Sequence, residues 1–212
     1  MDYSKAADYI SQIYADTPRP RHQEYLERTL TADFMPVIEN EVADFFRVLL
    51  QLVKAKHVLE IGMSIGFSTS SIANTVKAHG GHVTSIEIDQ DIASFARKNF
   101  ERLDLEDYIE VKIGDAENLI ADFEGESFDA VFQDADKALY PPLLDECLRV
   151  LKPGGLFLAN DALIPLRRNR EDWDDTMESI HTFNKKVADS TGLESTILPI
   201  GGGITFAMKK TS

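Results

Sequence analysis

The sequence predicts an α/β fold in which a doubly wound, mostly parallel sheet ends in an antiparallel hairpin. Residues 1–52 have the apolar spacing of amphipathic helices. From residue 57 onward, short apolar runs alternate with helical segments, which is typical of β-α-β units with right-handed crossovers. Near the C-terminus, two apolar runs flank the glycines at 201–203, and this spacing predicts a hairpin.

The expected elements follow in chain order. Helices are expected over DYISQIY, EYLERTL and ENEVADFFRVLLQLV, with the breaker TPRPR before the second. The five parallel strands are expected at 57–61, 82–88, 108–114, 128–134 and 156–160. The helices between them are expected at 68–79, 91–103, 116–123 and 140–151, with turns at 80–81 (GG) and 152–155 (KPGG). A long helix at 171–188 then leads to hairpin strands at 195–200 and 204–210.

Length and composition predict one ordinary globular domain. We take residues 1–212 as a single domain, with a helical lead-in at 1–52 and the α/β core at 57–212. Apolar residues make up 43% and charged residues 27%, the balance of a soluble protein. Neither a membrane helix nor a signal peptide is expected, because no apolar run is long enough. The lone Cys147 excludes an internal disulfide and favours a cytoplasmic location.

The charge is strongly acidic. The formal net charge of −14 repels phosphate backbones, so a nucleic-acid partner is not expected. The segment LRRNR at 166–170 is a local exception. It is either a solvated loop or a basic lip that faces a substrate or a phosphate.

The segment EIGMSIG after the first strand has two interpretations. Read as the G-x-S-x-G elbow of hydrolases, it makes Ser64 a nucleophile, with Asp161 and His181 following in chain order. That interpretation is disfavoured, because only helices precede this strand and no earlier strand loop can donate the second oxyanion-hole amide. In the other interpretation, Gly62 and Gly66 allow a cofactor to approach the backbone of the loop.

Two acidic residues favour a particular cofactor. Glu87, at the end of the second strand, suits the hydroxyls of a ribose. The glycine loop lacks the G-x-G-x-x-G pattern, and Glu60 would repel a pyrophosphate while attracting a cationic amino group. The sequence therefore predicts S-adenosylmethionine (SAM) rather than a dinucleotide.

Polar side chains follow the fourth and fifth strands. Asp134, Asp136 and Lys137 come after the fourth strand, and Asn160 and Asp161 come after the fifth. The carboxyl ends of parallel strands meet at one edge of the sheet, where ligands bind. Carboxylate and amide oxygens suit Mg²⁺, although Asp and Asn at such places also serve as helix caps.

Seven motifs together resemble one family. LEIGMSIGFS, SIEID, IGDA, FDAVFQDADKALY, LKPGG, ND and LPIGGGITFAMKK are similar to those of the cation-dependent, small class I SAM O-methyltransferases. This Rossmann-like group includes catechol and caffeoyl-coenzyme A O-methyltransferases and bacterial relatives, one of which modifies a hydroxyuridine in transfer RNA. The resemblance runs from about residue 35 to the C-terminus. It also implies a homodimer, with the N-terminal region helping in dimerisation and substrate capping.

The resemblance implies roles for individual residues. The implied cofactor-binding residues are Ile38, Glu60, Gly62, Ser68, Glu87, Asp115, Ala116 and Asp134. The implied metal ligands are Asp134, Asn160 and Asp161, and the implied catalytic residues are Lys137 and Asp134. Tyr140 matches an aromatic residue near the family's site. Trp173 either anchors a helix or lies near the acceptor pocket.

The chain departs from the family pattern at two places. Relatives have Asp-Asn where this chain has Asn160-Asp161, which preserves the charge and the number of ligands but exchanges the oxygen types. The family's P-x-G-D-G has Gly202 in place of its Asp, so a carboxylate that makes hydrogen bonds around the site is missing.

These observations predict methyl transfer from SAM to a hydroxyl of a small catechol-like aromatic. Mg²⁺ or another divalent cation is expected to lower the pKa of that hydroxyl, and Lys137 is expected to accept the proton or stabilise the phenolate. Two alternatives stay open. The chain could be a transfer RNA hydroxyuridine O-methyltransferase of the same fold, or a protein that binds SAM without catalysis.

Overall fold

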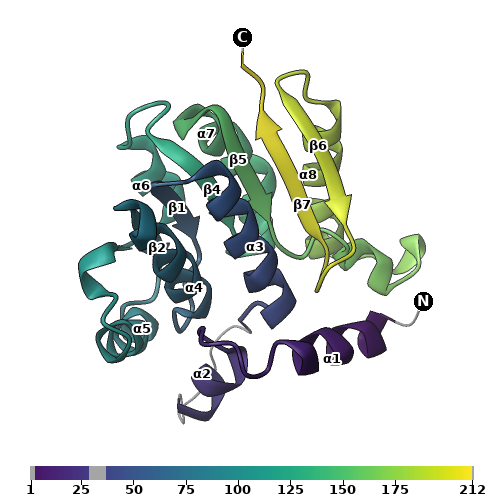
Figure 1. Ribbon diagram of the computed structural model, residues 1–212. Helices are drawn as coiled ribbons and strands as arrows, with labels where there is room; N and C mark the ends of the chain where they lie inside the picture. The colour runs from purple at the N-terminus through teal and green to yellow at the C-terminus, as the bar shows by residue number, and fades with distance from the viewer. Residues whose placement is uncertain (1–2, 29–36, 212) are drawn as a thin grey trace.

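The protein is built around one seven-stranded sheet. The structure, a computed structural model, describes residues 3–28 and 37–211. The strands are β1 (His57–Ile61), β2 (His82–Glu87), β3 (Ile109–Ile113), β4 (Phe128–Gln133), β5 (Leu151–Ala159), β6 (Leu193–Leu198) and β7 (Ile204–Lys209). Their order in the sheet is β3-β2-β1-β4-β5-β7-β6 (Figure 1). The first five strands are parallel, and β7 runs antiparallel to both β5 and β6. The predicted fold class is therefore confirmed.

Helices cover both faces of the sheet. They are α1 (Tyr3–Ile13), α2 (His22–Arg28), α3 (Asn40–Val53), α4 (Phe67–Val76), α5 (Gln90–Arg102), α6 (Ala116–Ala121), α7 (Tyr140–Val150) and α8 (Asp175–Asp189). Helices α3 and α4 pack on one face, whereas α6, α7 and α8 pack on the other. Within the described residues, no helix has the length and apolar character needed to cross a membrane.

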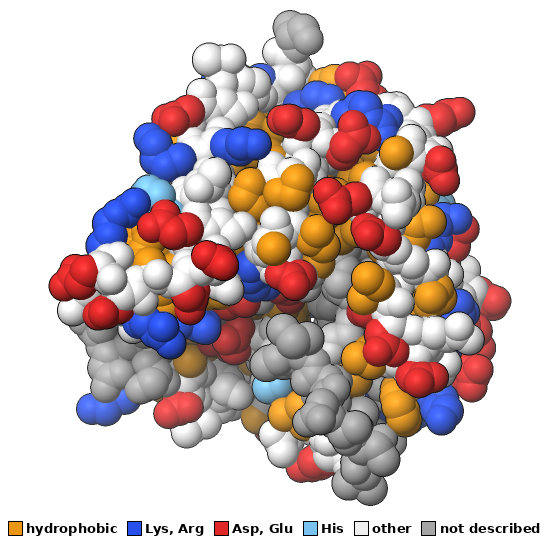
Figure 2. Space-filling model, turned by 180° about the vertical axis from the view of Figure 1, so that it is seen from behind, with side chains coloured by type: hydrophobic (Ala, Val, Ile, Leu, Met, Phe, Trp, Pro, Cys, Tyr) orange, Lys and Arg blue, Asp and Glu red, His pale blue; other side chains and the backbone are white. Residues whose placement is uncertain are grey.

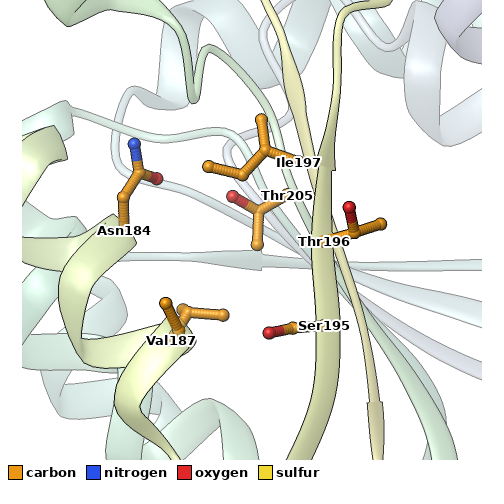
Figure 3. A pocket seen from close by; sticks show the side chains of 7 residues that line it. Asn184, Val187, Ser195, Thr196, Ile197 and Thr205 are labelled. Atoms are coloured by element: carbon orange, nitrogen blue, oxygen red, sulfur yellow. The ribbon is translucent and has the colours of Figure 1, made fainter.

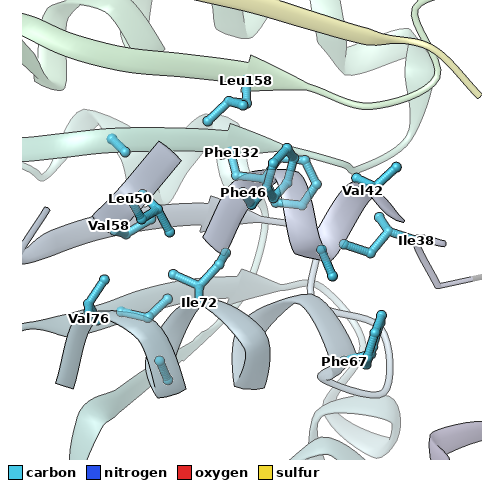
Figure 4. Packing of buried hydrophobic residues seen from close by; sticks show 14 of the residues in the cluster. Ile38, Val42, Phe46, Leu50, Val58, Phe67, Ile72, Val76, Phe132 and Leu158 are labelled. Atoms are coloured by element: carbon cyan, nitrogen blue, oxygen red, sulfur yellow. The ribbon is translucent and has the colours of Figure 1, made fainter. Parts of the chain in front are cut away.

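Successive residues of the central strands face opposite sides of the sheet. Val58 belongs to the core under α3 and α4, whereas its neighbour Leu59 belongs to the core under α7. On the α3 side, the rings of Phe46 and Phe132 meet edge to face with their centroids 4.5 Å apart (Figure 4). Burial on both faces explains why the sequence of β1 is a short apolar run rather than an alternating one.

Cys147 is part of this core. It is fully buried on the apolar face of α7, and burial raises the pKa of its thiol. On the outer surface, Figure 2 shows acidic and basic side chains interspersed, with apolar side chains between them.

Several boundaries differ from the sequence prediction, and two of them have a clear physical reason. The KPGG segment, expected as a turn, lies within β5, and the pairing register with β4 shifts between Phe128 and Ala130. The last long helix begins at Asp175 rather than at residue 171, because the Asp174 carboxylate accepts a hydrogen bond from the Met177 amide and caps the helix. Part of the predicted segment EYLERTL, at 29–30, lies outside the described residues.

The loops that matter for function meet where the strand order reverses. Strands β2 and β3 follow β1 in the chain and lie on one side of it in the sheet. The chain then crosses to the other side of β1, where β4 and β5 lie. Such a reversal opens a crevice at the carboxyl ends of the strands. The Asp134 amide donates to the Ile61 carbonyl at 2.8 Å, and the Asn160 amide donates to the Gln133 carbonyl at 3.1 Å. These bonds hold the ends of β1, β4 and β5 side by side.

Candidate functional site

The glycine loop after β1 is shaped by contacts within the protein. Gly62 has φ +92°, and a Cβ there would lie 2.3 Å from the Asp134 carbonyl oxygen. Gly66 has φ +84°, and a Cβ there would lie 2.5 Å from the ring of Phe100. The sequence interpretation explained both glycines by the approach of a ligand. The structure gives a different reason, because protein atoms already occupy the space that either Cβ needs.

Glu87 organises the same loop. Its Oε2 accepts hydrogen bonds from the amides of Met63 (3.2 Å) and Ser64 (3.0 Å), and its Oε1 accepts one from the amide of Asp89 (3.1 Å). The end of β2 is thereby joined to the glycine loop. Carboxylate oxygens have further lone pairs, so Glu87 can still accept hydrogen bonds from a ligand.

Glu60 is enclosed rather than exposed to the loop surface. It is 0% exposed, and its Oε2 accepts hydrogen bonds from the hydroxyls of Thr69 and Ser85. Its Oε1 has no partner among the described residues. Burial raises the pKa of Glu60 to about 7, although the hydroxyls of Ser68, Ser85 and Thr69 oppose this change. A cationic group near the loop would favour the ionised form of this carboxyl.

The other predicted cofactor residues lie around this loop and the ends of the strands. Ser68 is buried in the first turn of α4, and Ile38 is buried just before α3. The Asp115 carboxylate caps α6 by accepting a hydrogen bond from the Glu117 amide at 2.8 Å, and Ala116 is buried beside it. Asp115 therefore has a structural role whether or not it also contacts a ligand.

Lys137 forms the centre of a polar cluster at the ends of β4 and β5. Its Nζ lies 3.0 Å from Asp134 Oδ1, 3.2 Å from Asp161 Oδ2, 3.0 Å from the Tyr140 hydroxyl and 3.2 Å from the Ala135 carbonyl. Burial disfavours the charged amine, but the oxygens of Tyr140, Asp134 and Asp161 outweigh it and raise the pKa of Lys137. Lys137 is therefore a cation held by oxygen atoms.

Tyr140 connects this cluster to the ends of β4 and β5. It is fully buried, and its hydroxyl lies 3.1 Å from each of the carbonyl oxygens of Gln133 and Asn160. Burial raises the pKa of its phenol, although the charge of Lys137 opposes this change. A neutral phenol tied to two strand ends fixes the position at which it meets the lysine.

Asn160 and Asp161 lie beside the lysine. Asn160 Nδ2 lies 3.3 Å and 3.4 Å from the two carboxylate oxygens of Asp134. Asn160 Oδ1 is buried and has no hydrogen-bond partner in the part of the chain that the structure describes. Asp161 has φ 61°, and Arg167 NH2 lies 3.5 Å from its Oδ1. Asp136, by contrast, caps the following turn by accepting from the Ala138 amide, so only Asp134 of the predicted pair joins the cluster.

The oxygen set can accept a divalent cation. Two carboxylates and one amide oxygen without a partner converge at the strand ends, and these are hard oxygen ligands. Residues 3–28 and 37–211 contain no group of three or more His, Cys, Asp or Glu side chains that could hold a metal ion by themselves. Water or substrate oxygens would therefore have to complete the coordination, as Mg²⁺ permits.

The sequence analysis missed Glu39. A Cβ at Gly201 would lie 2.5 Å from its Oε2, so this side chain packs against the glycine turn of the hairpin. Burial raises its pKa, and the charges of Asp161 and Asp134 contribute in the same direction. The glycines at 201–203 and the acidic residue before α3 were both visible in the sequence, but nothing indicated that they meet.

The basic segment at 166–170 reaches the edge of the site only through Arg167. Arg168 and Arg170 form ion pairs with Asp174 and Glu178 instead. The guanidinium of Arg170 also lies 4.3 Å from the centre of the Trp173 ring. The Trp173 indole donates a hydrogen bond to the Arg168 carbonyl at 3.3 Å, so it anchors this segment.

A separate pocket of about 270 Å³ lies between α8 and the terminal hairpin (Figure 3). Its labelled lining side chains come from both elements, and Thr205 and Asn184 each have a side-chain oxygen without a hydrogen-bond partner among the described residues. None of its lining residues is a predicted site residue. The pocket is therefore distinct from the cluster around Lys137.

The chain matches one protein family model, and it is similar to several known proteins and solved structures. A family model described as O-methyltransferase matches residues 20–210. A catechol O-methyltransferase of Niastella koreensis is 29% identical over 162 residues, which cover 74% of this chain and 73% of that protein. Caffeoyl-CoA O-methyltransferase 1 of Eucalyptus globulus is 27% identical over 216 residues, which cover 94% of this chain and 85% of that protein. The crystal structure of an O-methyltransferase from Bacillus cereus in complex with SAH is 26% identical, covers 95% of this chain and 97% of that chain, and has a TM-score of 0.81.

Proposed function

The chain belongs to the O-methyltransferase family, and we propose that it transfers the methyl group of SAM to one of two neighbouring hydroxyls on a small aromatic acceptor. The resemblance seen in the sequence is confirmed, although the family match begins at residue 20 rather than near residue 35. The chain is a SAM-dependent O-methyltransferase, and the hydrolase alternative is abandoned. The observation that carries the finer proposal is the cluster of Lys137, Asp134, Asn160 and Asp161 beside the glycine loop.

For the cofactor, we propose the predicted loop as the binding site. Glu87 would accept hydrogen bonds from ribose hydroxyls, because it is partly exposed at the end of β2. Gly62 follows the end of β1, and Ser68 lies in the first turn of α4. The methionine part of SAM would lie beside these two residues. Glu60 would act through Ser68, Thr69 and the loop, because its own carboxylate is fully buried. Asp115 and Ala116 would form the adenine side, and Ile38 would contact the cofactor through its backbone.

For the reaction, alignment and charge matter most. Transfer from a sulfonium is an in-line displacement, so the protein must hold the acceptor oxygen opposite the leaving sulfur. We propose that Lys137 stabilises the phenolate as it forms, because its ammonium has oxygen partners on several sides and is positioned by Tyr140. Asp134, Asn160 and Asp161 would hold a divalent cation, which supplies Lewis-acid chemistry that lowers the pKa of an acceptor hydroxyl.

We also propose a homodimer formed through the N-terminal helices. Tyr9 and Ile13 of α1 are 65% and 60% exposed, and Leu52 of α3 is 73% exposed. Apolar side chains gathered on neighbouring helices are typical of an interface. A cytoplasmic location also stays a prediction, resting on the single buried Cys147.

The proposed reaction is tested by methyl transfer from labelled SAM to a panel of catechols, with Mg²⁺ and with EDTA. Transfer that EDTA abolishes would support both the acceptor class and the cation. Transfer that survives EDTA would support the acceptor class and overturn the cation. SAM binding without transfer to any catechol would overturn the acceptor class and direct the search to RNA or to a non-catalytic role.

A further inference from the structure

The ammonium group of Lys137 lies between the two carboxylates that we propose as cation ligands. Its Nζ is 3.0 Å from Asp134 Oδ1 and 3.2 Å from Asp161 Oδ2. All three side chains are largely buried, with exposed fractions of 13%, 14% and 24%. An ammonium has three hydrogens, and the Tyr140 hydroxyl and the Ala135 carbonyl offer further partners. The lysine therefore pairs with both carboxylates at the place where a metal ion would bind, although its single positive charge offsets only one of their two negative charges.

Gly202 makes the contact between Lys137 and Asp161 possible. A Cβ at residue 202 would lie 2.2 Å from Asp161 Oδ1, so any other residue would displace this carboxylate or be displaced by it. The exchanged order of Asn160 and Asp161 puts the carboxylate, rather than an amide, above this glycine. The two departures from the family pattern therefore meet in one contact, between Gly202 and Asp161. Asp161 is also a carboxylate partner of Lys137.

We infer that Lys137 is an internal competitor for the divalent cation, so that cation binding requires the lysine to leave Asp161. The inference rests on the proposed function, because it concerns the cation proposed there. The ammonium of Lys137 and a divalent cation, placed between the same carboxylates, would repel each other strongly at such distances. Each carboxylate oxygen that accepts from the ammonium also has fewer lone pairs for a metal ion. Asn160 Oδ1 does not contact the lysine, so it stays available to a cation throughout.

This competition links two events at the site. When a cation is bound, the ammonium loses one of its carboxylate partners and becomes available to the acceptor hydroxyl. When no cation is bound, the lysine offsets part of the negative charge of the cluster and joins Asp134 to Asp161. By thermodynamic reciprocity, the factor by which a bound cation weakens the contact between Lys137 and Asp161 equals the factor by which that contact weakens cation binding.

The test measures cation binding without SAM or acceptor. Mn²⁺ is titrated by calorimetry into the wild type, Lys137→Met and the matched control Lys185→Met, whose lysine is exposed on α8. We expect Lys137→Met to lower the Kd for Mn²⁺ by about tenfold or more and Lys185→Met to leave the Kd unchanged. Adding Asp134→Asn to Lys137→Met should abolish this gain in affinity. Equal or weaker binding by Lys137→Met would overturn the inference.

A second measurement uses only the wild type, in case Lys137→Met does not fold. Lysine acylation is followed by mass spectrometry with and without saturating Mn²⁺. We expect Mn²⁺ to speed the labelling of Lys137 several-fold and to leave that of Lys185 unchanged; equal labelling of Lys137 would overturn the inference. Because neither measurement needs an acceptor, a failure of methyl transfer to catechols would be distinguishable from a failure of the competition.

Discussion

Glu60 offers the sharpest test of how the site is built, through the variant Glu60→Gln. Its carboxyl is 0% exposed, with two hydroxyl donors on Oε2 and no partner on Oε1 among the described residues. Burial raises its pKa from an ordinary value of 4.5 to about 7. A glutamine has nearly the same shape as the protonated acid and can accept from Thr69 and Ser85.

The sign and size of the effect follow from this pKa. Because the folded-state pKa lies above the unfolded one, the protonated group stabilises the fold fully below pH 4.5, and this contribution is lost as the pH rises through about 7. The difference between 4.5 and about 7, at about 1.36 kcal/mol for each pKa unit, corresponds to roughly 3 kcal/mol. Glutamine does not ionise, so Glu60→Gln removes this pH-dependent loss.

The assay is urea unfolding of the wild type, Glu60→Gln and the exposed control Glu101→Gln between pH 4.5 and 8. At pH 4.5 the wild type and Glu60→Gln should be similar in stability. At pH 8 Glu60→Gln should be more stable by up to about 3 kcal/mol, whereas Glu101→Gln should follow the wild type throughout. Parallel curves for the wild type and Glu60→Gln would refute the reasoning.

Three further substitutions test other contacts. Gly62→Ala should destabilise the protein by about 2 kcal/mol or more in urea unfolding, because of its positive φ and the Asp134 carbonyl; a loss below about 0.5 kcal/mol would contradict this. Glu87→Gln should weaken SAH binding about tenfold in calorimetry, since hydrogen bonds to a charged acceptor are stronger, and an unchanged Kd would argue against ribose binding. Gly202→Asp should displace Asp161 and lower the free energy of unfolding by about 1–3 kcal/mol, so wild-type stability would show that the turn can adapt.

The sheet could be predicted because its signals are local. The central strands β1 and β4 are buried on both faces, so each appears in the sequence as a short, mainly apolar run between helical segments, whereas the edge strand β3 is only partly buried and its sequence alternates. The first strand, at 57–61, was predicted with its observed bounds. The start of α8 was missed by four residues, because Asp172, Asp174 and Asp175 can each cap a helix and only the three-dimensional contact selects Asp174. The KPGG segment was missed because pairing with β4 overrides its turn preference.

The reasons for site residues were harder to predict than their positions. Gly62 was found from the sequence, yet the atom that requires a glycine belongs to Asp134, which is 72 positions later in the chain. Glu39 was missed for the same reason, since its neighbour Gly201 is in the terminal hairpin. Contacts of this kind depend on where the sheet brings the strand ends, and one sequence without the fold does not contain that information.

The two departures from the family pattern are better understood together than separately. Taken alone, the exchange at Asn160-Asp161 moves a carboxylate, and the glycine at 202 removes one. In the structure, the moved carboxylate of Asp161 occupies the space in which a side chain at 202 would begin. The site therefore keeps an acidic group at the glycine turn. This group comes from the residues after β5 instead of the hairpin, and it forms an ion pair with Lys137. It follows that restoring an aspartate at 202 would displace the side chain of residue 161 whether that residue is aspartate or asparagine, because the two side chains have nearly the same shape.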